Sequence, residues 1–60
     1  MTLEEHARAI EAAIQAAADD GCFIDNGQGL TPGRMDLNKV DDAGDPEAWV
    51  ELSLPRSPLD

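Results

Sequence analysis

Residues 2–21, TLEEHARAIEAAIQAAADDG, predict a single amphipathic helix. Thr2 and Glu5 have the spacing of a capping box, in which each side chain accepts a hydrogen bond from the other residue's backbone amide. Seven of the nine alanines of the chain lie in this segment, and alanine has the highest intrinsic helix propensity. Gly21 suits the left-handed position that follows a helix end. We therefore expect the helix to begin just after Thr2 and to end just before Gly21.

The apolar residues of this helix form one stripe, because successive residues turn by about 100°. The polar residues Arg8, Glu11, Gln15 and Asp19 fall on or near the opposite side, and Glu4 is placed to pair with Arg8. Alanines around the stripe allow a close approach by another element. We interpret the stripe as packing on the strands of the same chain; the alternative is a helix that binds a partner's groove or a second copy. The stripe consists of Leu3, Ala7, Ile10, Ile14 and Ala17.

Two later segments alternate polar and apolar residues, as half-buried strands do. Residues 34–40 alternate as far as Leu37, and Val40 then falls out of phase, which indicates either a β-bulge or the end of the strand. Residues 48–54 alternate throughout, with Val50 and Leu52 on the apolar face and Pro55 after them. An acidic loop separates the two segments, so they are predicted to pair as an antiparallel hairpin.

The connection between the helix and the hairpin contains two turn signals. Residues 22–24 are apolar and could form a short strand, in which Cys22 would be a small buried hydrophobic residue. An Asn-Gly pair follows at 26–27, and Leu30 could anchor the loop. Residues 31–33, Thr-Pro-Gly, fit a turn with glycine at its third position. A competing interpretation makes Thr31 the N-cap of a second helix, but Gly33 and the alternation after it argue against this.

Together these patterns predict the α+β class, with one N-terminal amphipathic helix packed on a small antiparallel sheet. The element order is α-β-β-β or α-β-β, depending on whether residues 22–24 form a strand. Residues 1–55 are expected to form one small domain and residues 56–60 a flexible C-terminal tail. The predicted core consists of Leu3, Ile10, Ile14, Phe23, Met35, Leu37, Val50, Leu52 and Leu54.

The formal charge of −9, from 13 acidic and 4 basic residues, excludes several kinds of partner. Direct binding to DNA or RNA requires neutralisation of phosphates, and anionic membrane surfaces attract basic segments. The chain has no long apolar run and no leader pattern, so we expect a cytoplasmic protein. Its single lysine beside many alanines suggests GC-rich bacterial or phage coding. One cysteine cannot form an internal disulfide, and a chain of this size gains stability from a second subunit, so a homodimer is possible.

No motif in the chain predicts catalysis or a bound cofactor. The acidic loop, with Asp41, Asp42, Asp45 and Glu47, has oxygen ligands that calcium could use, but their spacing fits no EF-hand loop. No second histidine is available to join His6 at a metal. Neither a catalytic triad nor a phosphate-binding glycine loop is present. We therefore expect no enzymatic activity, no cofactor and no metal site.

Trp49 lies on the polar phase of its predicted strand, beside Glu51 and Ser53. It could cover the sheet edge or pack under the tail near Pro55 and Leu59. The alternative is a partly exposed anchor for a protein partner, since tryptophan is enriched at binding hot spots. The candidate interface residues are Trp49, Glu51, Asp41, Asp42 and Asp45.

These observations predict a small acidic protein–protein interaction module without enzymatic activity, for which a basic protein is a candidate partner. The alternative is an acidic inhibitor that mimics nucleic acid and occupies a basic site on a DNA- or RNA-handling protein. A mimic needs carboxylates spaced along one exposed face. In the sequence they are divided among the helix start, the hairpin loop and a turn.

Overall fold

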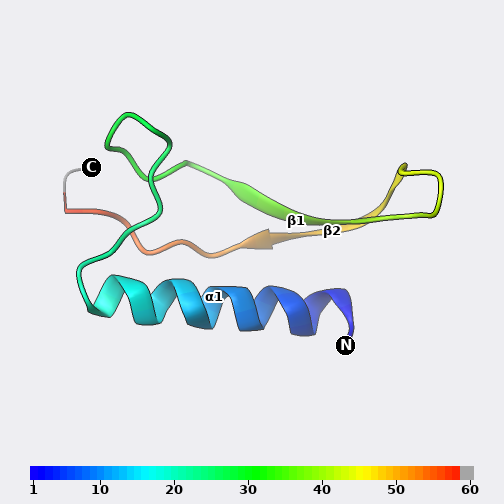
Figure 1. Cartoon of the computed structure of the whole chain (residues 1–60), viewed down its shortest axis with the longest axis horizontal. Helices are drawn as coiled ribbons and strands as arrows, with labels where there is room; N and C mark the ends of the chain where they lie inside the picture. The colour runs from blue at the N-terminus through cyan, green and yellow to red at the C-terminus, as the bar shows by residue number, and fades with distance from the viewer. Residues whose placement is uncertain (59–60) are drawn as a thin grey trace.

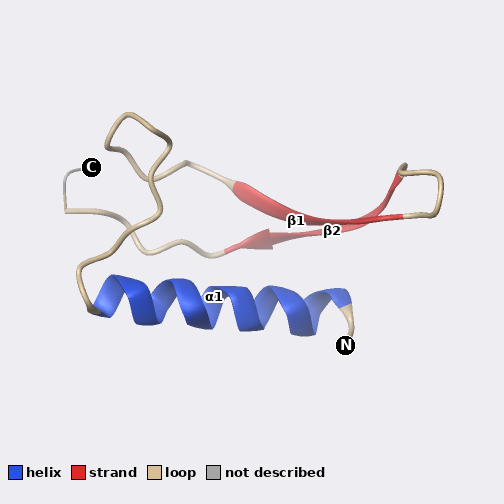
Figure 2. Cartoon of the chain, in the orientation of Figure 1, coloured by secondary structure: helices blue, strands red, loops and turns tan. Residues whose placement is uncertain are grey.

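A computed structural model describes residues 1–58, within which helix α1 (Leu3–Asp19) is followed by strands β1 (Met35–Val40) and β2 (Pro46–Leu52). The strands form an antiparallel hairpin, and α1 lies along one face of it (Figure 1). Figure 2 shows the connection from α1 to β1 as a loop along its whole length. The predicted α+β class is confirmed, and the order is α-β-β, the shorter of the two predicted orders.

Both ends of α1 follow from local sequence. The Thr2 amide donates to Glu5 Oε1 at 2.9 Å, and the Glu5 amide donates to Thr2 Oγ1 at 3.1 Å, so the capping box is present. At the other end, Gly21 has a φ of 85°, a left-handed conformation that glycine adopts without steric cost. The amides of Gly21 and Cys22 bond back to carbonyl oxygens of the last turn, which satisfies groups that a helix end leaves unpaired.

The segment after α1 differs from the prediction. Residues 22–24 are not a strand, and Cys22 is exposed instead of buried. The Cys22 amide closes the helix end, so this residue stays beside the last turn of α1 and does not reach the space between helix and hairpin. Phe23 and Ile24 are half-buried, whereas Leu30 is 46% exposed and does not anchor the loop.

The hairpin contains a β-bulge where the polar–apolar alternation breaks. Lys39 is opposite Ala48 and Val40 is opposite Pro46, so Glu47 has no cross-strand partner. Both interpretations of the out-of-phase Val40 are therefore confirmed, because the bulge lies there and β1 also ends at Val40. Strand β2 begins at Pro46, two residues before the predicted start, at a position where proline is tolerated because it lies at the beginning of an edge strand.

The core between helix and hairpin is thin. Its most buried apolar residues within the described range are Ala7, which is 0% exposed, and Leu52, which is 7% exposed, and no large side chain of that range is fully buried. The prediction that Ile10 and Met35 belong to the core is wrong, because they are 37% and 38% exposed. A single helix over two strands leaves residues at the margins of the contact open to solvent. The other predicted core residues that are half-buried are Leu3, Ile14, Phe23, Leu37, Val50 and Leu54.

The molecule is elongated and flat, with principal extents of 39, 23 and 13 Å. Its radius of gyration is 13.1 Å, whereas a compact domain of this length has about 10 Å. The hairpin tip extends past the N-terminal end of α1 (Figure 1). Within residues 1–58, no helix has the length and apolar character that crossing a membrane requires.

Candidate functional site

The face of the hairpin that points away from α1 is polar, apart from one tryptophan. Strand alternation and register place Trp49 opposite Asn38, and Glu51 opposite Asp36. The alternate residues of the same strands face α1, and among these Leu52 is buried. We call the outward surface the open hairpin face; it consists of Asp36, Asn38, Trp49 and Glu51, together with Arg34, which precedes β1.

Trp49 is held in place on this face and remains accessible. Trp49 is 61% exposed, and the guanidinium carbon of Arg34 lies 5.0 Å from the centroid of the Trp49 ring. Such a cation–π contact contributes about 0.5–1 kcal/mol at an exposed site. Arg34 is itself fixed, because its Nε donates to Asp36 Oδ1 at 3.0 Å. The hydrogen bond from Arg34 to Asp36, followed by the charges of Asp36 and Glu51, raises the pKa of Arg34, so the cation stays charged.

The structure brings only part of the predicted interface together. Trp49 and Glu51 share the open hairpin face, whereas Asp41, Asp42 and Asp45 lie in the loop at the hairpin tip. Trp49 lies four positions after Asp45 along the strand, which corresponds to roughly 13 Å. The tip lies at the far end of the hairpin, beyond the helix (Figure 1). The acidic tip and Trp49 are therefore two separate surface features.

Asp41 has a structural role at the tip. Its Oδ1 accepts hydrogen bonds from the amides of Ala43 and Asp45 at 3.0 and 2.9 Å, and Gly44 takes a φ of 85° to complete the turn. Asp42 and Asp45 are exposed. In the part of the chain that the structure describes, no three His, Cys, Asp or Glu side chains are grouped so that they could hold a metal ion.

A second polar feature, which the sequence did not predict, joins the C-terminal segment to the α1–β1 loop. Arg56 Nη1 donates to the carbonyl oxygens of Thr31 and Pro32 at 2.8 and 2.9 Å. The Ser57 amide donates to Thr31 Oγ1 at 3.0 Å, and Thr31 is only 6% exposed. The beginning of the predicted tail is thus bonded to the loop. Leu59 and Asp60 lie outside the described residues, so the flexibility of the tail stays a prediction.

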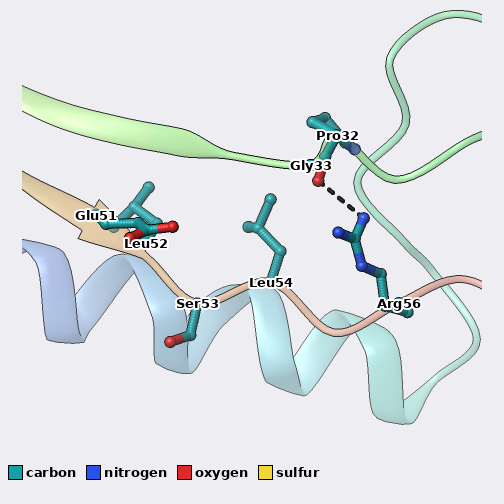
Figure 3. Close-up of a pocket in the computed structure, with 7 residues that line it drawn as sticks. All are labelled: Pro32, Gly33, Glu51, Leu52, Ser53, Leu54 and Arg56. Carbon is teal, nitrogen blue, oxygen red and sulfur yellow. Dashed lines mark hydrogen bonds between the residues drawn. The ribbon is translucent and has the colours of Figure 1, made fainter.

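These bonds border a hollow of about 410 Å³ between the loop and the chain after β2, shown in Figure 3. The Leu54 side chain points toward Gly33, and the Ser53 hydroxyl points the other way (Figure 3). Arg56, the cation of the hollow, is already bonded to two carbonyl oxygens. The hollow therefore offers Glu51 as its one uncommitted ionisable side chain among the described residues that line it.

The backbone at this hollow corrects one expectation about the turn at residues 31–33. Gly33 does not have a positive φ, and a turn of the predicted kind requires a positive φ at its third position. The chain bends there without that turn, because Thr31 is held by Ser57 and the carbonyl oxygens of Thr31 and Pro32 face Arg56.

Comparisons of this chain with protein-family models, with curated proteins and with solved structures found no match. The function must therefore be inferred from the residues and geometry of the chain itself.

Proposed function

We propose that this protein is a small acidic interaction module without enzymatic activity, and that its open hairpin face binds a protein partner with Trp49 as the central anchor. The observation that carries the proposal is the exposure of Trp49, 61%, combined with the position of Arg34 over its ring. A large aromatic surface left in water gains free energy when a partner covers it, and tryptophan and arginine dominate binding hot spots.

The chemistry of the face indicates what the partner offers. Arg34 forms an ion pair with Asp36, so Glu51 is the carboxylate on this face that a basic side chain of the partner could bind. An apolar pocket in the partner would receive the indole. Asp42 and Asp45 at the hairpin tip, with the overall charge of −9, would attract a basic protein and speed its association.

Mimicry of nucleic acid receives less support than the tryptophan anchor. Its requirement is a row of carboxylates on one exposed face. The acidic residues are instead divided among the two ends of α1, the hairpin tip and the open hairpin face. Two of them are already bonded within the chain, because Asp41 accepts from its own loop and Asp36 pairs with Arg34. The proposal for Trp49 needs no such row, because an aromatic anchor acts through burial.

A capture experiment with matched variants tests the proposal. The immobilised wild-type chain, Trp49→Ala and Leu30→Ala are each exposed to an extract of the native host, and captured proteins are quantified by mass spectrometry. Leu30 is the control because it is also an exposed apolar residue, 46% exposed, but lies in the α1–β1 loop. We expect that the wild type and Leu30→Ala both capture one specific protein and that Trp49→Ala does not capture it. Equal capture by all three chains would refute the role of Trp49.

A further inference from the structure

One flank of α1 is not covered by the hairpin. The contact side of the helix centres on Ala7, and Glu11 faces the end of β2 from one side of that centre. The other side borders a groove of about 400 Å³ between α1 and β1, and a second groove of about 300 Å³ beside residues 22–24. We call this surface the bare flank; its residues are His6, Ile10, Ala13 and Ala17 of α1, with Leu37 and Lys39 of β1.

The bare flank differs in charge from the rest of the molecule. None of the described residues that line its two grooves is an aspartate or a glutamate, and Lys39 supplies a positive charge. The chain as a whole carries −9, so two copies repel each other over most of their surfaces. This repulsion is weakest at the bare flank, and the bare flank also exposes apolar side chains. Its charge therefore favours a second copy over a basic partner.

Strand β1 places a free sheet edge next to this flank. In the described part of the chain β1 pairs with β2 alone, so its other edge has unpaired backbone donors and acceptors. Such an edge readily accepts another strand, and a two-stranded hairpin is marginally stable by itself. A strand added at β1 would lie beside the groove that Ile10 and Leu37 border.

The geometry and the area also fit a second copy. Strands about 4.8 Å apart would place the helices of two copies roughly 10 Å from each other, the usual distance between packed helices, and Ala13 and Ala17 allow that approach. The chain exposes 4345 Å², roughly 560 Å² more than area scaling gives for its 6.4 kDa. Covering about that area on each copy corresponds to a small, reversible interface.

We propose that a second copy of this chain docks on the bare flank. The two copies are related by a two-fold axis, with β1 beside β1 of the second copy and the two bare flanks in contact. The result is a four-stranded sheet with both helices on one face. The open hairpin faces of both copies stay free on the other, so this inference does not depend on the proposed function.

Sedimentation equilibrium over a wide range of concentrations tests the dimer. The chains are the wild type, Ile10→Glu on the bare flank, and Ala12→Glu, which adds the same charge on the exposed opposite side of α1. We expect the wild type to shift from 6.4 kDa toward twice that mass as concentration rises. Ile10→Glu should weaken this association by about tenfold or more, because like charges would meet in the interface, and Ala12→Glu should change it little.

Lys39→Glu is a second variant in case Ile10→Glu does not fold, as circular dichroism would reveal. Lys39 is exposed, so its replacement leaves the core intact while adding an acidic group to the bare flank. Added salt should strengthen the wild-type dimer, since it screens the repulsion between copies. A wild type that stays at 6.4 kDa throughout, a folded Ile10→Glu or Lys39→Glu that dimerises normally, or an equal loss in Ala12→Glu would overturn the proposal. Capture through Trp49 would be unaffected by any of these results.

Discussion

The carboxylate of Glu11 accepts a hydrogen bond from the backbone amide of Ser53 at 2.5 Å, although the two residues are 42 positions apart. The other carboxylate oxygen pairs with Arg8 at 2.8 Å, and the Glu11 side chain is only 15% exposed. This side chain therefore ties the middle of α1 to the end of β2, on the opposite side of the helix from the bare flank.

Replacing Glu11 with alanine should destabilise the fold. The exposed Ser53 amide would lose its charged acceptor, which costs about 0.5–1.5 kcal/mol in the free energy of unfolding. Arg8→Ala should cost less than about 1 kcal/mol, because Arg8 is 58% exposed and exposed ion pairs contribute little. Urea unfolding followed by circular dichroism measures both, with Gln15→Ala as the exposed control. A Glu11→Ala midpoint equal to that of Gln15→Ala would show that the bond does not stabilise the fold.

Ala7 should not tolerate a larger side chain. It is 0% exposed, so Ala7→Leu would force α1 and the hairpin apart at a cost of about 1–3 kcal/mol. Ala12→Leu makes the same change at an exposed position of the same helix and should be nearly neutral. Thermal melts of the two variants should differ clearly, and identical midpoints would mean that Ala7 is not the centre of the packing.

The capping box should make helix stability depend on acidic pH. Hydrogen bonds with the backbone and side chain of Thr2 lower the pKa of Glu5 below its ordinary value of 4.5. Because the folded pKa is lowered, the stabilisation is complete above the ordinary value and is lost as pH falls from 4.5 through the folded pKa. Glu5→Gln keeps an acceptor for the Thr2 amide and removes the titration. Chemical unfolding at neutral and acidic pH should show a smaller loss of stability in Glu5→Gln than in the wild type; equal losses would count against the box.

Thr31 should control the order of the C-terminal segment. Thr31→Val removes the oxygen that accepts from the Ser57 amide, whereas Thr31→Ser keeps it. We expect hydrogen exchange at the Ser57 amide to accelerate strongly in Thr31→Val and little in Thr31→Ser. Rapid exchange already in the wild type would show that residues after Pro55 are flexible, as the sequence alone predicts.

The features that could be predicted from sequence are those determined by neighbouring residues. The Thr2–Glu5 box and Gly21 give the helix ends, and the break in alternation at Val40 gives the bulge. Alternation also placed Trp49 on the face away from Leu52. Each of these signals acts over a few residues, so no tertiary information is needed.

The features that could not be predicted depend on contacts between distant segments. The expected place of Glu11 on the side opposite the stripe is wrong, because at about 100° per residue it lies only about 40° from the buried Ala7. Its bond to the Ser53 amide could not be predicted, because Ser53 is 42 positions away in the chain. Thr31 has no local signal for burial, because its partners Arg56 and Ser57 come from the other end of the chain. The contact of Arg34 with Trp49 likewise needs the register of the hairpin.

The measurement that tests the role of Trp49 most directly is the kinetics of binding to the captured partner, at low and at high salt. We predict that Trp49→Ala raises the dissociation rate constant by about thirtyfold, as expected for a hot spot worth about 2 kcal/mol, and that the effect persists at high salt. Replacing Asp42 and Asp45 with asparagine should mainly slow association at low salt. The opposite result, unchanged dissociation in Trp49→Ala with affinity lost on neutralising Asp42 and Asp45, would contradict the account and favour a mimic of nucleic acid.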